Sequence, residues 1–275
     1  MSVTKDPSGR RSVQFEFEVP GTPEEVWRAL ATGPGISSWF VPTEIEERDG
    51  KAAGVTYHFG PGVDIHSVVT ACDVPRTFTQ EAAGWMPGSP PMATEWHIEA
   101  RGGGTCTVRM VHSLFASTDD WDNQLEGAKG GWSGFLSILR LYLKHFSGQR
   151  SAIMQVTAPV LSTDAEAWEA LTSALGVKGV GAGQRFTAPA GVPPLSGVME
   201  YLTENPFDAS LRLDQPAPGI AALGANTYPG GQTMVAMNLY LYGDQAAEIA
   251  ARVTPLWEAW FQERFPLPAE PGQSK

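Results

Sequence analysis

The stretch Thr22-Pro23-Glu24-Glu25-Val26-Trp27-Arg28-Ala29-Leu30 decides how the chain is interpreted, because it occurs twice. It is typical of a helix start: Thr22 supplies an N-cap hydroxyl, Pro23 occupies the first helical position and Glu25 the third, which is the pattern of a capping box. The second copy, Thr163-Asp164-Ala165-Glu166-Ala167-Trp168-Glu169-Ala170-Leu171, repeats the Thr, the third-position Glu, the Trp, the Ala and the Leu at a constant offset of 141 residues. This agreement in register indicates an internal repeat.

An extended segment precedes each capping box. In the first half Val13, Phe15, Phe17 and Val19 alternate with polar residues, which is the period of a strand with one buried face. The matching segment of the second half, Ala152 to Val160, alternates less clearly. Both segments are predicted as strands.

Each half ends in a long segment of helical periodicity. The first follows a polar start at Asp119 to Asp122, ends before Ser147-Gly148, and has these apolar residues at helical spacing: Leu125, Trp132, Phe135, Leu136, Leu139, Leu143 and Phe146. The second has Ile249, Val253, Leu256, Trp257, Trp260 and Phe261. Pro255 should kink the second helix, because proline cannot donate a backbone hydrogen bond.

Glycines gather near the start of the first long helix, at Gly127, Gly130, Gly131 and Gly134. Each costs about 1 kcal/mol of helix stability relative to alanine. We expect a frayed or broken first turn there, with close approach of the backbone to a ligand as the alternative. Two other glycine clusters, Gly33-Pro34-Gly35 and Gly102-Gly103-Gly104, are predicted as turns and lack the context of phosphate-binding loops.

Strand-like runs bounded by turn residues lie between the short and the long helix of each half. In the first half they are Val55 to Phe59, Ile65 to Cys72, Thr77 to Ala82, Thr94 to Ala100 and Thr105 to Leu114. In the second they are Ser196 to Thr203, Ala209 to Gln215, Ala222 to Tyr228 and Thr233 to Tyr242, with a hairpin at Pro229-Gly230-Gly231. We therefore predict an α+β protein with tandem helix-grip domains, each a curved antiparallel sheet around a long C-terminal helix. The expected bounds are 12–148 and 151–266, followed by a tail at 267–275.

Composition narrows the classes of function. The chain of 275 residues is 42% hydrophobic and 18% charged, with 22 Pro and 30 Gly, which is typical of a globular protein rich in turns. A net charge of -11 with scattered Lys and Arg argues against nucleic acid as a partner. No apolar run is long enough for a membrane span, and the start Met1 to Arg11 lacks the apolar core of a signal peptide. A cytoplasmic protein without membrane insertion is the expectation.

The two cysteines, Cys72 and Cys106, lie at no metal-binding or redox spacing. We interpret both as buried reduced thiols. No metal-ligand cluster, paired-carboxylate motif or Ser-His-Asp order is present in the sequence, and we expect neither a metal nor a cofactor.

The sequence resembles the START and birch-pollen-allergen-like helix-grip proteins, called the SRPBCC superfamily. Within that superfamily it is most similar to the bacterial homologues of the heat-shock-protein-90 ATPase activator. The resemblance rests on landmarks in the family's order: Pro23 to Leu30, Trp39-Phe40, Val74-Pro75-Arg76-Thr77-Phe78, Gly103-Gly104-Thr105, His112-Ser113 and Gly131-Trp132. These landmarks cover residues 12–147. The second half lacks the Trp-Phe and Gly-Trp landmarks, so it resembles a degenerate copy.

The resemblance implies a cavity between the sheet and the long helix. Strand parity places Val108, Met110 and His112 together on one face of their strand, and it likewise places Thr94, Trp96 and Ile98 together on one face of theirs. The predicted ligand-binding residues are Trp39, Phe40, Trp85, Trp96, Met110, His112, Trp132, Phe135 and Leu139. The alternative for most of them is that they only form the core.

The leading hypothesis is a binding protein, not an enzyme, for a small hydrophobic molecule that is aromatic or lipid-like. The second is an enzyme similar to the two-domain aromatase/cyclases of polyketide synthesis, with His112 as the proton-transfer group and His66 or Asp64 as partners. The third is an interaction module that resembles a co-chaperone. A homodimer is an alternative that the sequence leaves open.

Overall fold

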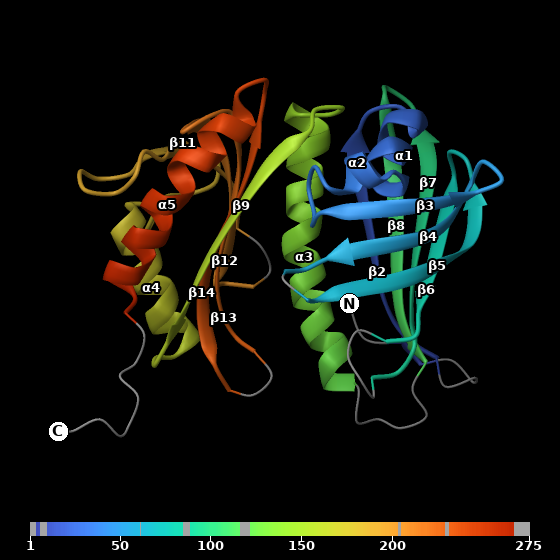
Figure 1. Cartoon of the computed structure of the whole chain (residues 1–275), viewed down its shortest axis with the longest axis horizontal. Helices are drawn as coiled ribbons and strands as arrows, with labels where there is room; N and C mark the ends of the chain where they lie inside the picture. Colours follow the sequence, from blue (N-terminus) through green and yellow to red (C-terminus); the bar gives the residue numbers. More distant parts are fainter. Residues whose placement is uncertain are drawn as a thin grey trace. The chain divides into compact units, whose positions relative to one another are not determined.

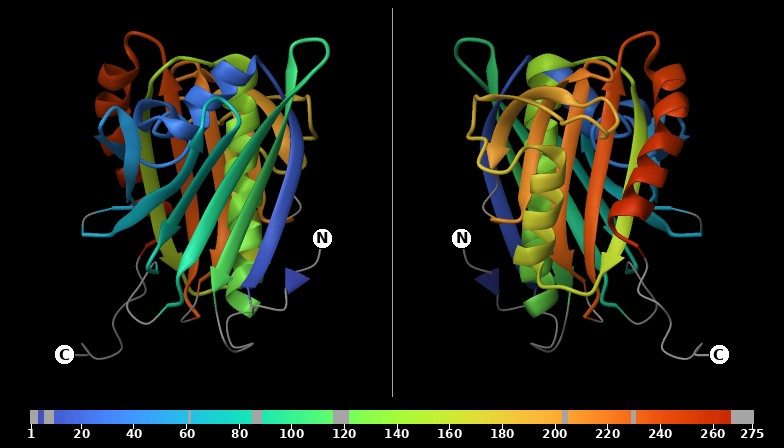
Figure 2. Two further views of the ribbon diagram at one scale, coloured as in Figure 1. Left: turned by 90° about the vertical axis from the view of Figure 1, so that its right-hand side faces the viewer. Right: turned by 90° about the vertical axis from the view of Figure 1, so that its left-hand side faces the viewer.

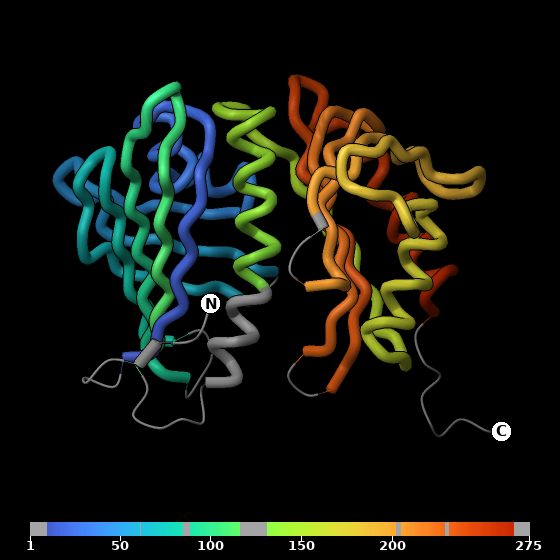
Figure 3. The backbone as a smooth tube through the Cα atoms, turned by 180° about the vertical axis from the view of Figure 1, so that it is seen from behind, coloured from blue at the N-terminus to red at the C-terminus, as the bar shows by residue number. Residues whose placement is uncertain are grey.

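The computed structural model describes residues 4–5, 10–60, 62–84, 89–115, 122–202, 205–228 and 231–266; of residues 4–5, 122–130 and 202 it describes the backbone only. The chain divides into two compact units, Met1–Arg150 and Ser151–Lys275, called here the N-terminal and the C-terminal unit. The colours of Figure 3 follow the first unit from blue to green and the second from yellow-green to red. Within the described residues, none of the helices has the length and apolar character needed to cross a membrane.

The N-terminal unit is one antiparallel sheet with a long helix along it. Its elements are β1 (Thr4–Lys5), β2 (Arg10–Pro20), α1 (Pro23–Ala31), α2 (Gly33–Ile36), β3 (Thr43–Arg48), β4 (Lys51–His58), β5 (Asp64–Asp73), β6 (Thr77–Ala82), β7 (Met92–Arg101), β8 (Thr105–Phe115) and α3 (Asp122–His145). The strand order is β1-β2-β8-β7-β6-β5-β4-β3. Figure 1 shows α3 running along one face of this curved sheet.

The C-terminal unit has a smaller sheet with both helices on one face. Its elements are β9 (Ser151–Val160), α4 (Asp164–Leu175), β10 (Arg185–Thr187), β11 (Ser196–Leu202), β12 (Asp208–Gln215), β13 (Gly219–Thr227), β14 (Thr233–Tyr242) and α5 (Ala246–Arg264). The strand order is β10-β11-β12-β13-β14-β9. The right-hand view of Figure 2 shows α4 and α5 in front of this sheet, and both contribute apolar side chains to its core.

The predicted repeat is confirmed at atomic detail. Thr22 Oγ1 accepts a hydrogen bond from Glu25 N at 3.3 Å, and Glu25 Oε2 accepts one from Thr22 N at 2.8 Å. The same two bonds join Thr163 and Glu166, at 3.3 and 3.0 Å. In both units the strand before the capping box pairs with the strand before the long helix, β2 with β8 and β9 with β14. The α+β fold with tandem helix-grip domains is therefore confirmed.

Loss of either cap should destabilise its own unit. We expect Thr22→Ala and Thr163→Ala each to lower the free energy of unfolding by about 1 kcal/mol, because each removes the acceptor for a helix N–H. Chemical denaturation measures this change. Thr70→Ala, at an exposed strand position, is the matched control. A loss no larger than that of the control would contradict the role of the caps.

Several local predictions were wrong. Gly33-Pro34-Gly35, predicted as a turn, lies in the short helix α2, and β3 and β10 were not predicted. Cys72 is exposed and only Cys106 is buried. The α3 helix is continuous from Asp122, so its first turns are not broken at the glycines. Helix formation by the whole segment outweighs the low propensity of these glycines, as tertiary packing commonly does.

No close contact with the described residues of the protein explains Gly131 or Gly134, and close approach of this backbone to a ligand stays a prediction. A Cβ built on Gly131 or Gly134 would meet no described atom within 4 Å. By contrast, a Cβ on Gly35 would lie 1.8 Å from the carbonyl oxygen of Arg28. Glycine is therefore required in α2, where it lets α2 lie against α1 and sets the position of the Trp39-Phe40 pair that follows.

Candidate functional site

An aromatic cluster lies between α3 and the sheet of the N-terminal unit. Phe40 stacks on Trp132 with ring centroids 5.5 Å apart and an interplanar angle of 16°. Phe135 meets Phe40 edge-on at 4.5 Å, and Trp96 meets both Trp132 at 6.0 Å and Trp39 at 6.3 Å. Five predicted ligand-binding residues from α3, β7 and the segment after α2 are thus brought together.

Trp39 anchors this cluster to the first helix. Its side chain is 2% exposed, and its Nε1 donates a hydrogen bond to the carbonyl oxygen of Ala29 at 2.8 Å. The bond satisfies the only polar atom of the indole inside the core. Trp39 is therefore a supporting residue behind the cluster.

A row of polar side chains crosses the sheet opposite the aromatic cluster. Gln80, Thr94 and His112 are direct cross-strand partners on β6, β7 and β8. Thr94 Oγ1 and His112 Nδ1 lie 3.0 Å apart, within hydrogen-bond distance. At the other end Gln80 Nε2 donates to the hydroxyl of Tyr57 on β4. We call Tyr57, Gln80, Thr94 and His112 the polar row.

A cavity of about 60 Å³ is lined by the polar row together with aromatic and aliphatic side chains. Its walls are Phe40, Tyr57, Phe59, Ile65, Ser67, Gln80, Ala82, Met92, Thr94, His112 and Trp132. Such a volume can hold a few water molecules, whereas sites for drug-sized ligands measure roughly 300 to 1,000 Å³. The aromatic rings therefore fill most of the space that the sequence predicted to be hollow.

The cavity walls carry no net charge at neutral pH. Burial lowers the pKa of His112 to about 4, and it raises the pKa of Tyr57 to about 12 against the opposing effect of the Gln80 hydrogen bond. Both side chains are therefore neutral at pH 7. The other described wall residues have no ionisable side chain.

The remaining predicted residues lie elsewhere. Met110 and Leu139 are fully buried and lie in the core, not in the cavity wall. Trp85 lies outside the described residues. His66 and Asp64 are exposed on the other face of β5, where His66 bonds to Thr56 and Asp64 to His58. The structure does not bring them to His112.

Sequence reasoning missed Tyr57, Ser67 and Gln80. The signal for Gln80 was present, because Phe78, Gln80 and Ala82 follow the period of two that places them on one face of β6, and all three are buried. The same period was present at Tyr57, since Val55, Tyr57 and Phe59 alternate with polar residues, but its contact with Gln80 had no sequence signal. Its bond to Gln80 spans β5, and that proximity comes from the curvature of the sheet.

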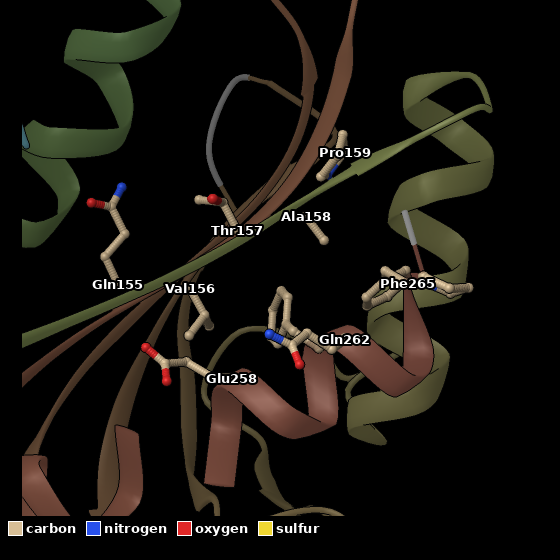
Figure 4. Close-up of a pocket in the computed structure, with 10 residues that line it drawn as sticks. Gln155, Val156, Thr157, Ala158, Pro159, Glu258, Gln262 and Phe265 are labelled. Atoms are coloured by element: carbon tan, nitrogen blue, oxygen red, sulfur yellow. The ribbon is translucent and has the colours of Figure 1, made fainter. Parts of the chain in front are cut away.

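The C-terminal unit contains a wider and more open groove between β9 and α5, with a volume of about 580 Å³. Figure 4 shows Val156 and Ala158 pointing from β9 toward α5, with Glu258 and Gln262 on the helix. On the core side of this sheet, apolar side chains from both helices pack against the strands. In the part of the chain that the structure describes, no three His, Cys, Asp or Glu side chains gather at a spacing that could hold a metal ion.

Comparisons with known proteins give a family for the N-terminal unit. Residues 20–144 match the family described as Activator of Hsp90 ATPase homolog 1-like protein. None of the curated proteins compared with the chain gives a significant match.

Solved structures similar to the chain include both single and double domains. CalU16 from Micromonospora echinospora is 19% identical over 52% of this chain and 83% of its own, with a TM-score of 0.41. The Aha1 dimer from Colwellia psychrerythraea is 21% identical over 50% of this chain and 98% of its own, with a TM-score of 0.39. The di-domain ARO/CYC BexL from the BE-7585A biosynthetic pathway is 12% identical over 94% of this chain and 100% of its own, with a TM-score of 0.46. Likenesses at this level say nothing about a ligand or a reaction.

Proposed function

Since its N-terminal unit belongs to the Activator of Hsp90 ATPase homolog 1-like family of helix-grip proteins, we propose that this chain binds a small hydrophobic molecule in the cavity of that unit, without catalysing a reaction. One observation carries the proposal: a cavity whose walls combine stacked aromatic rings with the side chains of the polar row. Such a combination of apolar walls with a few polar groups is typical of small-molecule sites.

The size of the cavity sets a condition on binding. An engineered protein cavity that binds benzene measures about 150 Å³, more than twice the space present here. A ligand therefore has to displace an aromatic wall residue. Phe59, with 39% of its surface exposed, and the half-buried Tyr57 and Trp132 are the aromatic wall residues with access to solvent, and Tyr57 is held by its bond to Gln80. We propose that Trp132 leaves its stacked position on Phe40 when the ligand enters.

Removal of the Trp132 indole should therefore strengthen binding. We expect Trp132→Ala to bind the neutral fluorescent probe N-phenyl-1-naphthylamine about tenfold more tightly than the unaltered chain does, because the ligand no longer competes with the indole. Fluorescence titration of the full chain measures the dissociation constant. Trp260→Ala, which removes a partly buried Trp from α5, controls for general exposure of apolar surface.

A second pair of variants locates the bound probe. In the Trp132→Ala chain, Ala82→Val should weaken binding because Ala82 forms part of the cavity wall. Ala100→Val makes the same change at an exposed position of β7 and should have no effect. If neither the unaltered chain nor Trp132→Ala binds the probe saturably, the proposed function is wrong.

The two other hypotheses have less support. An aromatase/cyclase mechanism needs a proton-transfer partner for His112, but the bonded neighbour is the Thr94 hydroxyl, and a pKa of about 4 makes the imidazole a weak base at neutral pH. An interaction with a chaperone is suggested only by the family description, and a pull-down with bacterial Hsp90 would test it.

Homodimer formation stays a prediction that size-exclusion chromatography can check.

A further inference from the structure

We infer that the ligand is a neutral molecule whose hydroxyl or N–H group donates a hydrogen bond to the side-chain amide of Gln80, while its apolar part lies against Phe40 in the place that the Trp132 indole leaves. This inference rests on the proposed function and names the chemical class of the ligand. It follows from one buried polar atom and from the character of the walls around it.

Gln80 has one bonded and one unbonded end. The side chain is 4% exposed, and its Nε2 donates to the hydroxyl of Tyr57. Its Oε1 is buried and has no hydrogen-bond partner among the described residues. Buried polar atoms in proteins are nearly always satisfied, so the molecule that occupies the cavity has to supply the donor. Water can do so in the free protein, and a ligand that displaces the water must replace its hydrogen bond.

The amide lies in the wall of the cavity, at the centre of the polar row. Thr94 is its direct partner on β7, and the Thr94 hydroxyl is bonded to His112 on the next strand. The opposite wall is apolar, with Trp132 stacked on Phe40. A ligand with one polar end and one flat apolar end matches this division of the walls.

The walls also disfavour an anionic ligand. The described wall residues include neither Lys nor Arg. The imidazole of His112 is neutral at pH 7 and its Nδ1 lies within hydrogen-bond distance of Thr94, so it brings no positive charge to the cavity. A carboxylate would be buried without a counter-charge, which is strongly unfavourable.

Four small aromatic compounds of similar size separate these possibilities. Phenol has a donor, anisole has an acceptor only, toluene has neither, and benzoate is an anion. In isothermal titrations of the full Trp132→Ala chain at pH 7, we expect phenol to bind about tenfold more tightly than toluene or anisole, because only phenol satisfies the Gln80 oxygen. Benzoate should bind more weakly than toluene.

Gln80→Leu in the same chain should abolish the preference, so that toluene binds at least as tightly as phenol. Gln14→Leu makes the same change at an exposed position of β2 and should keep the preference. If Gln80→Leu does not fold, the inference is still tested by comparing the binding of phenol with that of toluene and anisole in the chain that retains Gln80. Equal binding of phenol and toluene there would overturn this inference and leave the proposed function standing. Absence of binding by every aromatic compound, including N-phenyl-1-naphthylamine, would overturn the proposed function itself.

Discussion

The free energy of unfolding of the N-terminal unit is expected to fall by about 3 kcal/mol between pH 7 and pH 4 through His112 alone. Burial lowers the pKa of this imidazole from 6.5 to about 4. Across that window the unfolded chain binds a proton on His112 that the folded chain does not bind, so stability falls as the pH falls. The contribution is complete above the unfolded pKa and is lost at the folded pKa, below which both states carry the proton.

Urea denaturation at several pH values between 7 and 4 measures this effect. In His112→Gln the side chain stays polar but cannot titrate, so its stability should depend less on pH than that of the unaltered chain, by about 3 kcal/mol over the whole window. His66→Gln makes the same change at an exposed position and is the matched control for the substitution itself. Identical pH dependence of the unaltered chain and His112→Gln would show that His112 is not buried in its neutral form.

The second large effect is expected at Trp39. We expect Trp39→Ala to lower the free energy of unfolding of the N-terminal unit by about 4 kcal/mol, because it removes a buried indole and leaves a cavity that the core cannot close. The side chain is 2% exposed, contacts Phe40 and Trp96, and is bonded to the Ala29 carbonyl. Chemical denaturation followed by circular dichroism measures the change.

A matched pair of milder variants separates packing from hydrogen bonding. Trp39→Phe should lower the free energy of unfolding by more than the loss of side-chain volume alone would, because the Ala29 carbonyl also loses its hydrogen-bond donor. Trp257→Phe is the control: Trp257 is fully buried in the C-terminal unit, and its Nε1 has no hydrogen-bond partner among the described residues. There the substitution removes an unsatisfied N–H and should be tolerated better. Equal losses would contradict the role of the Trp39 bond.

Some features of the fold could be predicted from local sequence patterns, and others could not. The capping boxes at Thr22 and Thr163 and the alternation of Val13 to Val19 could be read from the sequence, because each depends on residues within one turn or one strand. The short helix α2 could not, because it depends on Gly35 lying against the carbonyl of Arg28 from the preceding helix. The exposure of Cys72 likewise depends on the sheet: Cys72 pairs with the buried Phe78 after a register shift in β5, yet residues 70–73 are all exposed.

The candidate site divides in the same way. The aromatic residues Phe40, Trp96 and Trp132 could be predicted as neighbours from strand parity and helical spacing together with the family resemblance. The polar row could not, since it requires the register of β6, β7 and β8 and a bond from Gln80 across β5 to Tyr57. His66 and Asp64 were associated with His112 by residue type alone, and the sheet separates them.

The sequence by itself determined the repeat, the fold class and the aromatic character of one cavity wall, because hydrophobic periodicity and helix capping are local properties of a chain. Only the tertiary structure decided that the cavity measures about 60 Å³, that Gln80 lies in its wall with a buried oxygen that has no partner among the described residues, and that His112 is neutral. Volume, hydrogen-bond satisfaction and desolvation depend on side chains brought together from distant strands. These three properties are set by the close packing of the folded chain, which no pattern along the sequence shows.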